Sequence, residues 1–336
     1  MGQSFKQWRL AAHPSGVPAP EHFELAEIEL PELEAGQVFI RTHYFSLDPG
    51  MRGRLSGDSY AAGLQIGEVI ESAGIGEIIA SKSERFKIGD MVMGGLGWSE
   101  GNVFTDRGLQ KLDPALFDDQ VSMTATIGVL GVPGLTAWFG LQDLGNPQEG
   151  ETLLISSAAG PVGATAGQIG KALGLRVIGL AGGAEKCAYL TDLGFDTAID
   201  YKAENDLAAA MRAACPDGVD IYFDNVGGAM LDAAILNMKM GGRIVVSGQV
   251  AEYNREKPEG IRHTTHFITH RLRMQGLVVY DYRKGFVEAQ GALAQMIRDG
   301  KLRYTEDISS GIEDAPSAYA ALFAGANFGR RLIMTI

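Results

Sequence analysis

A glycine-rich segment at residues 156–163 reads SSAAGPVG. It follows a short apolar run and opens a run of small residues, an order that predicts a strand, a tight turn and a helix. Gly160 would let the backbone approach a pyrophosphate, Gly163 would let the helix pack closely on the strand, and Ala158 replaces the first glycine of a dinucleotide-binding fingerprint. The N–H groups at a helix N-terminus attract phosphate. We therefore expect a dinucleotide-binding loop, with an ordinary glycine-rich turn as the alternative.

The end of the next expected strand indicates which dinucleotide binds. An NAD-selective site usually has an acidic side chain there, about 20 residues beyond the glycines, to bind the ribose 2′-hydroxyl. This strand ends at residues 179–183 as GLAGG, and Lys186 follows. A lysine suits a 2′-phosphate, although Glu185 weakens the local positive charge and a solvated lysine of the next helix is the alternative. We expect NADP in preference to NAD.

The cysteines and histidines do not form the ligand set of a catalytic zinc, which needs three protein ligands and an open position. The chain has two cysteines, Cys187 and Cys215, both in its second half. His263, His266 and His270 are spaced to share a helix face. Arginines flank them and no carboxylate accompanies them, which favours a solvated or interface helix. We expect no metal.

Without a metal there is no Lewis acid to polarise an alcohol or a simple ketone. Reduction of a double bond conjugated to a carbonyl does not need a Lewis acid. Hydride adds to the β-carbon, and a hydrogen-bond donor placed at the carbonyl oxygen stabilises the charge there. Tyr253, after an expected strand, is the candidate donor, with an aromatic packing role as the alternative. Water could protonate the α-carbon, and Asp48 belongs to an Asp-Pro-Gly turn. Arg52 is either a phosphate or substrate contact or a surface cation.

The elements that must position these residues change in type near residue 125. Before it, short segments punctuated by Gly, Pro and Asp predict a small barrel-like β domain. After it, apolar runs alternate with helical patterns and predict an α/β fold with a doubly wound parallel sheet. The expected early strands are residues 37–44, 67–72 and 90–93; the later strands are 151–156, 176–180, 221–223, 243–247 and 277–279; the helices are 162–173, 185–193, 229–238 and 285–298.

The strand-like stretch 330–336 could return to the first domain. We therefore expect a nucleotide-binding domain, residues 126–296, inserted in a β-rich domain made of residues 1–125 and 297–336. A net charge of −12 argues against a nucleic-acid or anionic-membrane surface. No apolar run approaches the ~20 residues of a membrane span. Two distant cysteines exclude a disulfide framework and indicate a reducing compartment, the cytoplasm.

Several motifs are similar to those of a known family. They are SLDPGMRGR at 46–54, GVPGLTA at 131–137, AAGPVG at 158–163, DNVGG at 224–228, a tyrosine–asparagine pair at 253–254 and GANFGR at 325–330. In this order they resemble the zinc-independent medium-chain dehydrogenase/reductase superfamily, and within it the prostaglandin/leukotriene reductases, plant alkenal double-bond reductases and bacterial curcumin-reductase-like enzymes. The resemblance implies a Rossmann domain inserted in a GroES-like catalytic domain, NADPH as the cofactor and a homodimer.

The resemblance also implies roles for single residues. The expected cofactor contacts are Thr136, Ala159, Gly160, Val162, Gly163, Gly182, Lys186, Tyr201, Asn225, Gly248 and Asn327, and Tyr253 is the expected active-site tyrosine. The expected substrate contacts are Tyr44, Arg52, Trp138 and Tyr280. Trp138 stands where tyrosine is commoner, and residues 249–252 depart from the family pattern, so we expect an altered substrate pocket.

These observations favour an NADPH-dependent 2-alkenal or 2-alkenone reductase acting on a small molecule. An NADPH quinone oxidoreductase is one alternative, which a quinone panel would separate. A non-catalytic nucleotide-binding protein, as some lens crystallins are, is another, and turnover of an enone would exclude it.

Overall fold

The computed structural model describes residues 4–57 and 62–336, which form two compact units. Unit 1 contains the described residues up to Ile127 and those from Glu306 to Ile336, and unit 2 runs from Gly128 to Thr305. Unit 2 is therefore inserted in unit 1. Unit 2 holds a parallel sheet and unit 1 is β-rich, which confirms the predicted fold class.

The chain returns from unit 2 to unit 1 after Thr305, later than the expected 296–297. Helix α8 (Phe286–Arg298) runs through the expected position without a break. Beyond it, the side-chain amide of Gln168 donates to the carbonyl oxygen of Arg303 and accepts from the Arg303 N–H, both at 2.8 Å. These bonds keep the chain after α8 with unit 2.

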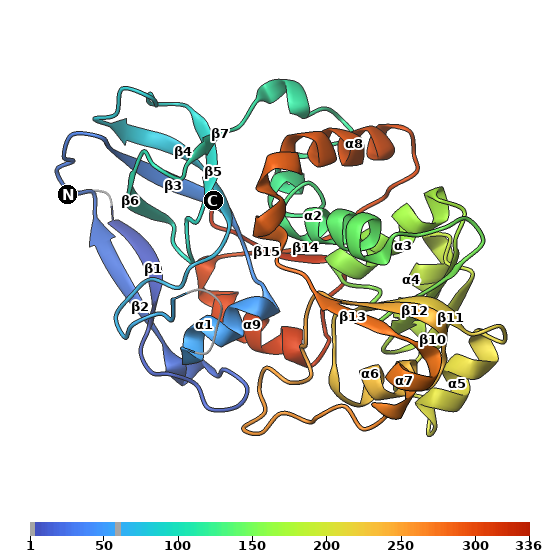
Figure 1. Cartoon of the computed structure of the whole chain (residues 1–336). Helices are drawn as coiled ribbons and strands as arrows, with labels where there is room; N and C mark the ends of the chain where they lie inside the picture. Colours follow the sequence, from blue (N-terminus) through green and yellow to red (C-terminus); the bar gives the residue numbers. More distant parts are fainter. Residues whose placement is uncertain (1–3, 58–61) are drawn as a thin grey trace. The chain divides into compact units, whose positions relative to one another are not determined.

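Unit 2 is built on a six-stranded parallel sheet (Figure 1). Its strands are β8 (Thr152–Ile155), β9 (Arg176–Ala181), β10 (Thr197–Asp200), β11 (Val219–Asp224), β12 (Met238–Val246) and β13 (Arg273–Gly276). In the order β10-β9-β8-β11-β12-β13, the strands after β8 are added first on one side of it (β9, β10) and then on the other (β11, β12, β13), so the strand order reverses between β8 and β11. The expected strand at 277–279 is wrong, because the last strand is β13 and residue 279 already begins the 3-10 helix η6 (Val279–Gly285). Strand β10 was not predicted.

Helices cover both faces of this sheet (Figure 1). They are α2 (Val132–Phe139), α3 (Pro161–Ala172), α4 (Ala184–Asp192), α5 (Leu207–Ala214), α6 (Gly228–Ile235), α7 (Thr265–His270) and α8. Leu154 of β8 belongs to the same buried cluster as Leu231 of α6. The neighbouring Leu153 points to the opposite face, where a Cβ on Gly170 of α3 would lie 2.8 Å from its side chain. This close approach explains the small residues of α3.

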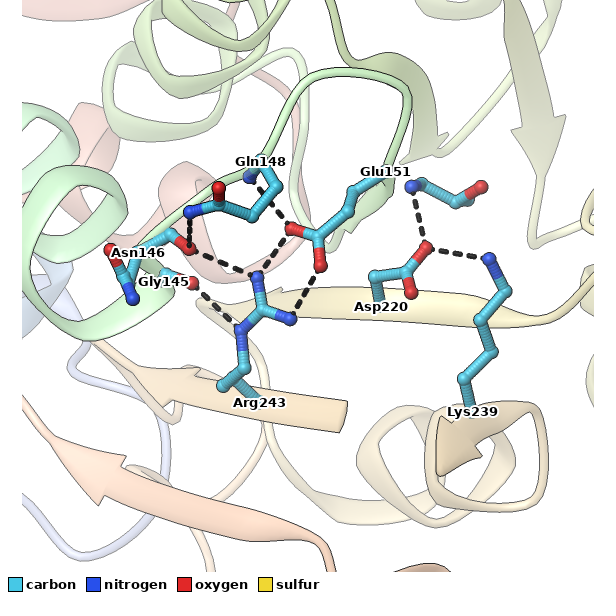
Figure 2. Close-up of polar contacts among 8 residues, drawn as sticks. Gly145, Asn146, Gln148, Glu151, Asp220, Lys239 and Arg243 are labelled. Atoms are coloured by element: carbon cyan, nitrogen blue, oxygen red, sulfur yellow. Dashed lines mark hydrogen bonds and ion pairs between the residues drawn. The ribbon is translucent and has the colours of Figure 1, made fainter. Parts of the chain in front are cut away.

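An ion-pair network lies near the amino end of β8 (Figure 2). The Arg243 guanidinium of β12 donates to the Glu151 carboxylate and to the Gly145 carbonyl, each at 2.8 Å. Asp220 of β11 forms a second ion pair with Lys239, at 2.7 Å. Gly145 ends η5 (Gly140–Gly145), which continues α2. The network thus ties the end of this helix to the central strands, at the edge opposite their carboxyl ends.

Unit 1 contains a seven-stranded sheet and a separate two-stranded sheet, β1-β2. The larger sheet has the order β14-β15-β3-β4-β5-β7, and β6 pairs with β3. The strands are β1 (Ser4–Leu10), β2 (Phe23–Glu29), β3 (Gln37–Ser46), β4 (Gly74–Ser81), β5 (Met91–Gly94), β6 (Gly101–Thr105), β7 (Gln110–Lys111), β14 (Glu306–Ser310) and β15 (Arg330–Met334), with helices α1 (Arg52–Ser56) and α9 (Ala315–Phe323). β15 pairs antiparallel with β3, so the C-terminal strand returns to the first domain as predicted.

Two other expectations for unit 1 are corrected. The expected strand at 67–72 is absent from this described stretch, where Val69 forms only an isolated bridge with Arg9. The order of the larger sheet ends at β14 and β7, so pairing among the described strands does not close a barrel. Within the described ranges, no helix is both long and apolar enough to cross a membrane.

Candidate cofactor and active site

The glycine-rich segment connects β8 to α3, as predicted. Ser157 has a φ of +50°, a left-handed conformation that is rare outside glycine and clusters at functional sites. A Cβ at Gly163 would lie 2.6 Å from the Ser157 carbonyl oxygen, and the N–H of Gly160 donates to that oxygen at 3.1 Å. The first N–H groups of a helix have no intrahelical partner, which suits a phosphate. The other predicted contacts here, Ala159 and Val162, belong to the same turn and the first turn of α3.

A buried aspartate joins the carboxyl ends of β8 and β11, where the strand order reverses. One carboxylate oxygen of Asp224 accepts from the hydroxyls of Ser156 and Tyr222, each at 3.0 Å, and from two backbone N–H groups of the next turn. Burial raises the pKa of Asp224, although these four donors act in the opposite direction. The Asn225 amide donates to the Ser156 carbonyl at 2.7 Å. Asn225 is therefore fixed at the reversal, where open α/β sheets bind ligands.

Tyr253 lies beside the point where the strand order reverses. The Ser247 hydroxyl donates to the Asn225 side-chain oxygen at 2.6 Å, which ties the end of β12 to the end of β11. A Cβ on Gly248 would lie 3.2 Å from the Asn225 carbonyl oxygen and 3.5 Å from the Tyr253 hydroxyl oxygen. That hydroxyl accepts a hydrogen bond from the Gln249 N–H at 3.2 Å. The structure thus brings together three predicted site residues: Asn225, Gly248 and Tyr253.

A second group of residues meets at the carboxyl end of β9. A Cβ on Gly182 would lie 3.1 Å from the Tyr201 hydroxyl oxygen and 2.8 Å from Cε of Lys202. Lys186, half-buried, lies in the first turns of α4 just beyond. The nearby Asp200 carboxylate accepts from the Gly183 N–H at 2.8 Å. Gly182 and Tyr201, two of the predicted cofactor contacts, therefore adjoin each other, and Lys202, which the sequence analysis did not single out, lies beside them.

The predicted contacts on α2 and η6 lie near an aromatic cluster of unit 2. Thr136 of α2 is partly exposed, and Trp138 packs on the buried cluster that contains Phe139. Tyr280 is 41% exposed, with the Arg283 guanidinium 5.2 Å from its ring centroid. An exposed aromatic ring is suited to stacking on a flat, conjugated molecule.

In unit 1, Asn327 lies in the turn between α9 and β15, and its amide donates to the Gly329 carbonyl at 3.1 Å. The next strand begins with Arg330, which is 4% exposed and donates to the Ile127 carbonyl at 2.7 Å. The Arg330 guanidinium also forms an ion pair with Asp48. This ion pair fixes the end of the turn that carries Asn327, and it occupies the Asp48 carboxylate.

The other two predicted residues of unit 1 differ in environment. Tyr44 of β3 is partly buried and packs on a cluster that contains Ile75. Arg52 is 4% exposed, and its guanidinium donates to the carbonyls of Pro14, at 2.9 Å, and Gly16, at 3.0 Å. These bonds direct Arg52 into unit 1 and favour a structural role over the predicted substrate contact.

The histidines of α7 form a stack. The rings of His266 and His270 are nearly parallel with centroids 5.0 Å apart, and His263 lies 6.3 Å from His266. Burial, followed by the charges of His270 and His263, lowers the pKa of His266. In the part of the chain that the structure describes, no group of three or more His, Cys, Asp or Glu side chains could hold a metal ion.

The architecture and the site together define a class of protein. A parallel sheet with a glycine-rich turn after its first strand, inserted in a β-rich unit, is the organisation of medium-chain dehydrogenases/reductases, as the motifs imply. Family models described as "N-terminal domain of oxidoreductase" and "Zinc-binding dehydrogenase" match residues 6–112 and 161–296.

Comparison with individual proteins narrows this class. The chain is 41% identical to the NADPH-dependent curcumin reductase of Escherichia coli (98% of this chain, 97% of the relative). It is 38% identical to the NADP(+)-dependent 2-alkenal reductase of Nicotiana tabacum, with the same coverage. It matches the crystal structure of CurA from Vibrio vulnificus in complex with NADPH, with a TM-score of 0.91, 38% identity and coverage of 98% and 99%. The chain belongs to the zinc-independent, NADP-dependent alkenal reductase group of the medium-chain dehydrogenase/reductase superfamily.

Proposed function

We propose that this chain binds NADPH and reduces the carbon–carbon double bond of α,β-unsaturated aldehydes or ketones. The observation that carries this function is the meeting of Asn225, Gly248 and Tyr253 at the carboxyl ends of β11 and β12. Relatives with 2-alkenal reductase and curcumin reductase activity, and a solved relative bound to NADPH, support it.

The residues of the site fit this cofactor. A Cβ on Gly160 would lie 3.3 Å from the Ser157 carbonyl oxygen, so the turn provides a cradle of bare backbone. Bound NADPH supplies a hydride. The pyrophosphate would lie on the glycine-rich turn and the adenosine end near Gly182, Lys186 and Tyr201. The remaining cofactor contacts that we propose are Thr136, Asn225, Gly248 and, from unit 1, Asn327.

Tyr253 is the residue that we assign to the substrate carbonyl. Negative charge develops on that oxygen when the β-carbon receives hydride, and a fixed O–H donor stabilises it. The Gln249 N–H donates to the Tyr253 hydroxyl at 3.2 Å. This bond orients the hydroxyl and strengthens it as a donor. The α-carbon then takes its proton from water.

The substrate contacts and the assembly are also part of the proposal. Tyr44, Trp138 and Tyr280 are the substrate candidates, and the aromatic surface of unit 2 favours conjugated substrates. We assign the chain to a cytoplasmic homodimer. Strand β13 lies at the edge of its sheet, and Ile268 of the preceding helix is 78% exposed, which suits pairing with a second copy.

Oxidation of NADPH in the presence of a panel of enals, enones and quinones tests the function. We expect turnover with the enals and enones, a saturated carbonyl product, and no turnover with the matching saturated aldehydes. Turnover confined to quinones would assign the chain to quinone reduction instead. Binding of NADPH without turnover of any panel member would indicate a non-catalytic protein.

A further inference from the structure

The register of two strands brings a lysine to the adenosine end of the proposed cofactor site. β10 pairs with β9 in parallel, with Asp200 opposite Ala181. The residues that follow each strand therefore leave the sheet side by side: Gly182 from β9, and Tyr201 and then Lys202 from β10. Cε of Lys202 lies 2.8 Å from where a Cβ of Gly182 would be, and the Tyr201 hydroxyl lies 3.1 Å from the same point.

The charges at this point favour an anion. An NAD-selective site has a carboxylate at the end of the second strand, whereas here the strand ends at Ala181 and is followed by Gly182, which a lysine side chain approaches. Asp200, at the end of β10, has one carboxylate oxygen occupied by the N–H groups of Gly183, at 2.8 Å, and Lys202, at 3.1 Å. Lys202 is exposed, and its ammonium forms no ion pair among the described residues.

We propose that Lys202 is a second cation for the cofactor 2′-phosphate, and that it determines the preference for NADPH together with Lys186 and Tyr201. The inference rests on the proposed function. Gly182 is needed for this role of Lys202, because any larger residue at position 182 would displace the Lys202 side chain. The ammonium replaces the carboxylate of NAD-selective sites and repels no part of NADPH.

Binding of two nucleotides that differ only in the phosphate tests this role. Titration calorimetry with 2′,5′-ADP and with 5′-ADP isolates the 2′-phosphate contribution, and it requires no substrate. Lys202→Ala should weaken 2′,5′-ADP about 3- to 20-fold and leave 5′-ADP unchanged, because a charge-assisted bond at an exposed site is partly screened. Lys202→Arg, which keeps the charge, should retain most of the preference. Gly182→Ala should weaken 2′,5′-ADP in the same direction.

Lys301→Ala is the matched control, since this exposed lysine of the same unit pairs with Asp299 at 3.6 Å. It should bind both nucleotides as the wild type does. An unchanged preference in Lys202→Ala, or equal weakening of both nucleotides, would overturn the role of Lys202 while leaving the proposed function intact. A wild-type protein that binds both nucleotides equally would overturn the proposed cofactor choice itself.

Discussion

The hydroxyl of Tyr253 is the single group on which the proposed chemistry depends most. It accepts from the Gln249 N–H at 3.2 Å. Tyr253→Phe keeps the ring and removes this oxygen, so we expect kcat to fall by about 10- to 1000-fold, with the affinity for NADPH unchanged. Steady-state kinetics on an enone with a primary isotope effect measures the change. Tyr189→Phe, which removes a hydroxyl that donates to Thr305 at 3.1 Å, is the control.

A wild-type kcat in Tyr253→Phe would return this residue to a packing role. A raised KM with an unchanged kcat would mean that Tyr253 binds the ground state and the transition state equally.

Lys186 carries the second residue-level prediction. Its place in the first turns of α4, beyond Gly182, suits a 2′-phosphate. A charge-assisted bond there contributes about 1.5–3 kcal/mol, so Lys186→Ala should raise the KM for NADPH by roughly 10- to 150-fold. The KM for NADH, which lacks the phosphate, should stay nearly constant. Parallel changes with both cofactors would contradict this role.

The residues of the site were predictable only where neighbours in the sequence carry the signal. Gly160 and Gly163 are recognised within one short segment, and Lys186 by its distance from it. Asp224 acts through Ser156, 68 positions away in the chain, and no local pattern encodes that bond. Lys202 depends on the register of β10 with β9, and β10 itself was not predicted.

Among the elements, the junction of β8 and α3 leaves no room for a side chain larger than that of glycine. A Cβ at Gly163 would lie 2.6 Å from the Ser157 carbonyl oxygen and 2.7 Å from the Ala158 Cα. Gly163→Ala should therefore cost about 1–3 kcal/mol of unfolding free energy and also weaken NADPH binding. Chemical denaturation and cofactor titration measure the two effects.

Gly291→Ala is the matched control for this prediction. Gly291 lies in α8, and a Cβ there would have no neighbour within 4 Å. The change should stabilise the chain by about 0.5–1 kcal/mol, because alanine is the better helix former. If Gly163→Ala were as benign, the close approach of α3 to β8 would not be needed.

The ion pair between Glu151 and Arg243 (Figure 2) predicts how this end of the sheet responds to acid. Burial alone would raise the pKa of Glu151, but the Arg243 guanidinium, the Gln148 N–H and Lys239 outweigh it and hold the pKa below its usual 4.5. A lowered folded pKa stabilises the fold above 4.5, and this contribution is lost as the pH falls below that value. Carboxylates usually titrate between about pH 5 and about pH 3. Over this range, the melting temperature of Glu151→Gln should thus fall less than that of the wild type. Identical acid profiles would contradict the contribution of this pair.

The pattern of elements was predictable where periodicity is strong. Apolar runs alternating with helical patterns correctly predict the strands and helices from β8 to α4 and the helix α8. The expected strand at 277–279 fails because Val279 begins a 3-10 helix, and its apolar side chain is buried among aromatic residues instead. An apolar run shows that side chains are buried but not whether the backbone pairs in a sheet.

For the whole molecule, unit 2 is inserted in unit 1, and the predicted contacts occur in both units. The glycine-rich turn, Asn225 and Tyr253 belong to unit 2, and Asn327 and Tyr44 belong to unit 1. The sequence predicts the insertion itself, from the change in pattern near 125 and the strand-like tail. The exact return point after Thr305 depends on the bonds between Gln168 and Arg303, which join distant segments.

The position of the transferred hydride tests the central claim of enone reduction most directly. NADPH that carries deuterium at the transferable position of its nicotinamide would be incubated with the enzyme and an enone, and the product would be analysed by NMR. We predict a saturated ketone with deuterium on the β-carbon and a solvent-derived hydrogen on the α-carbon. An unsaturated alcohol with deuterium on the carbinol carbon would contradict the account.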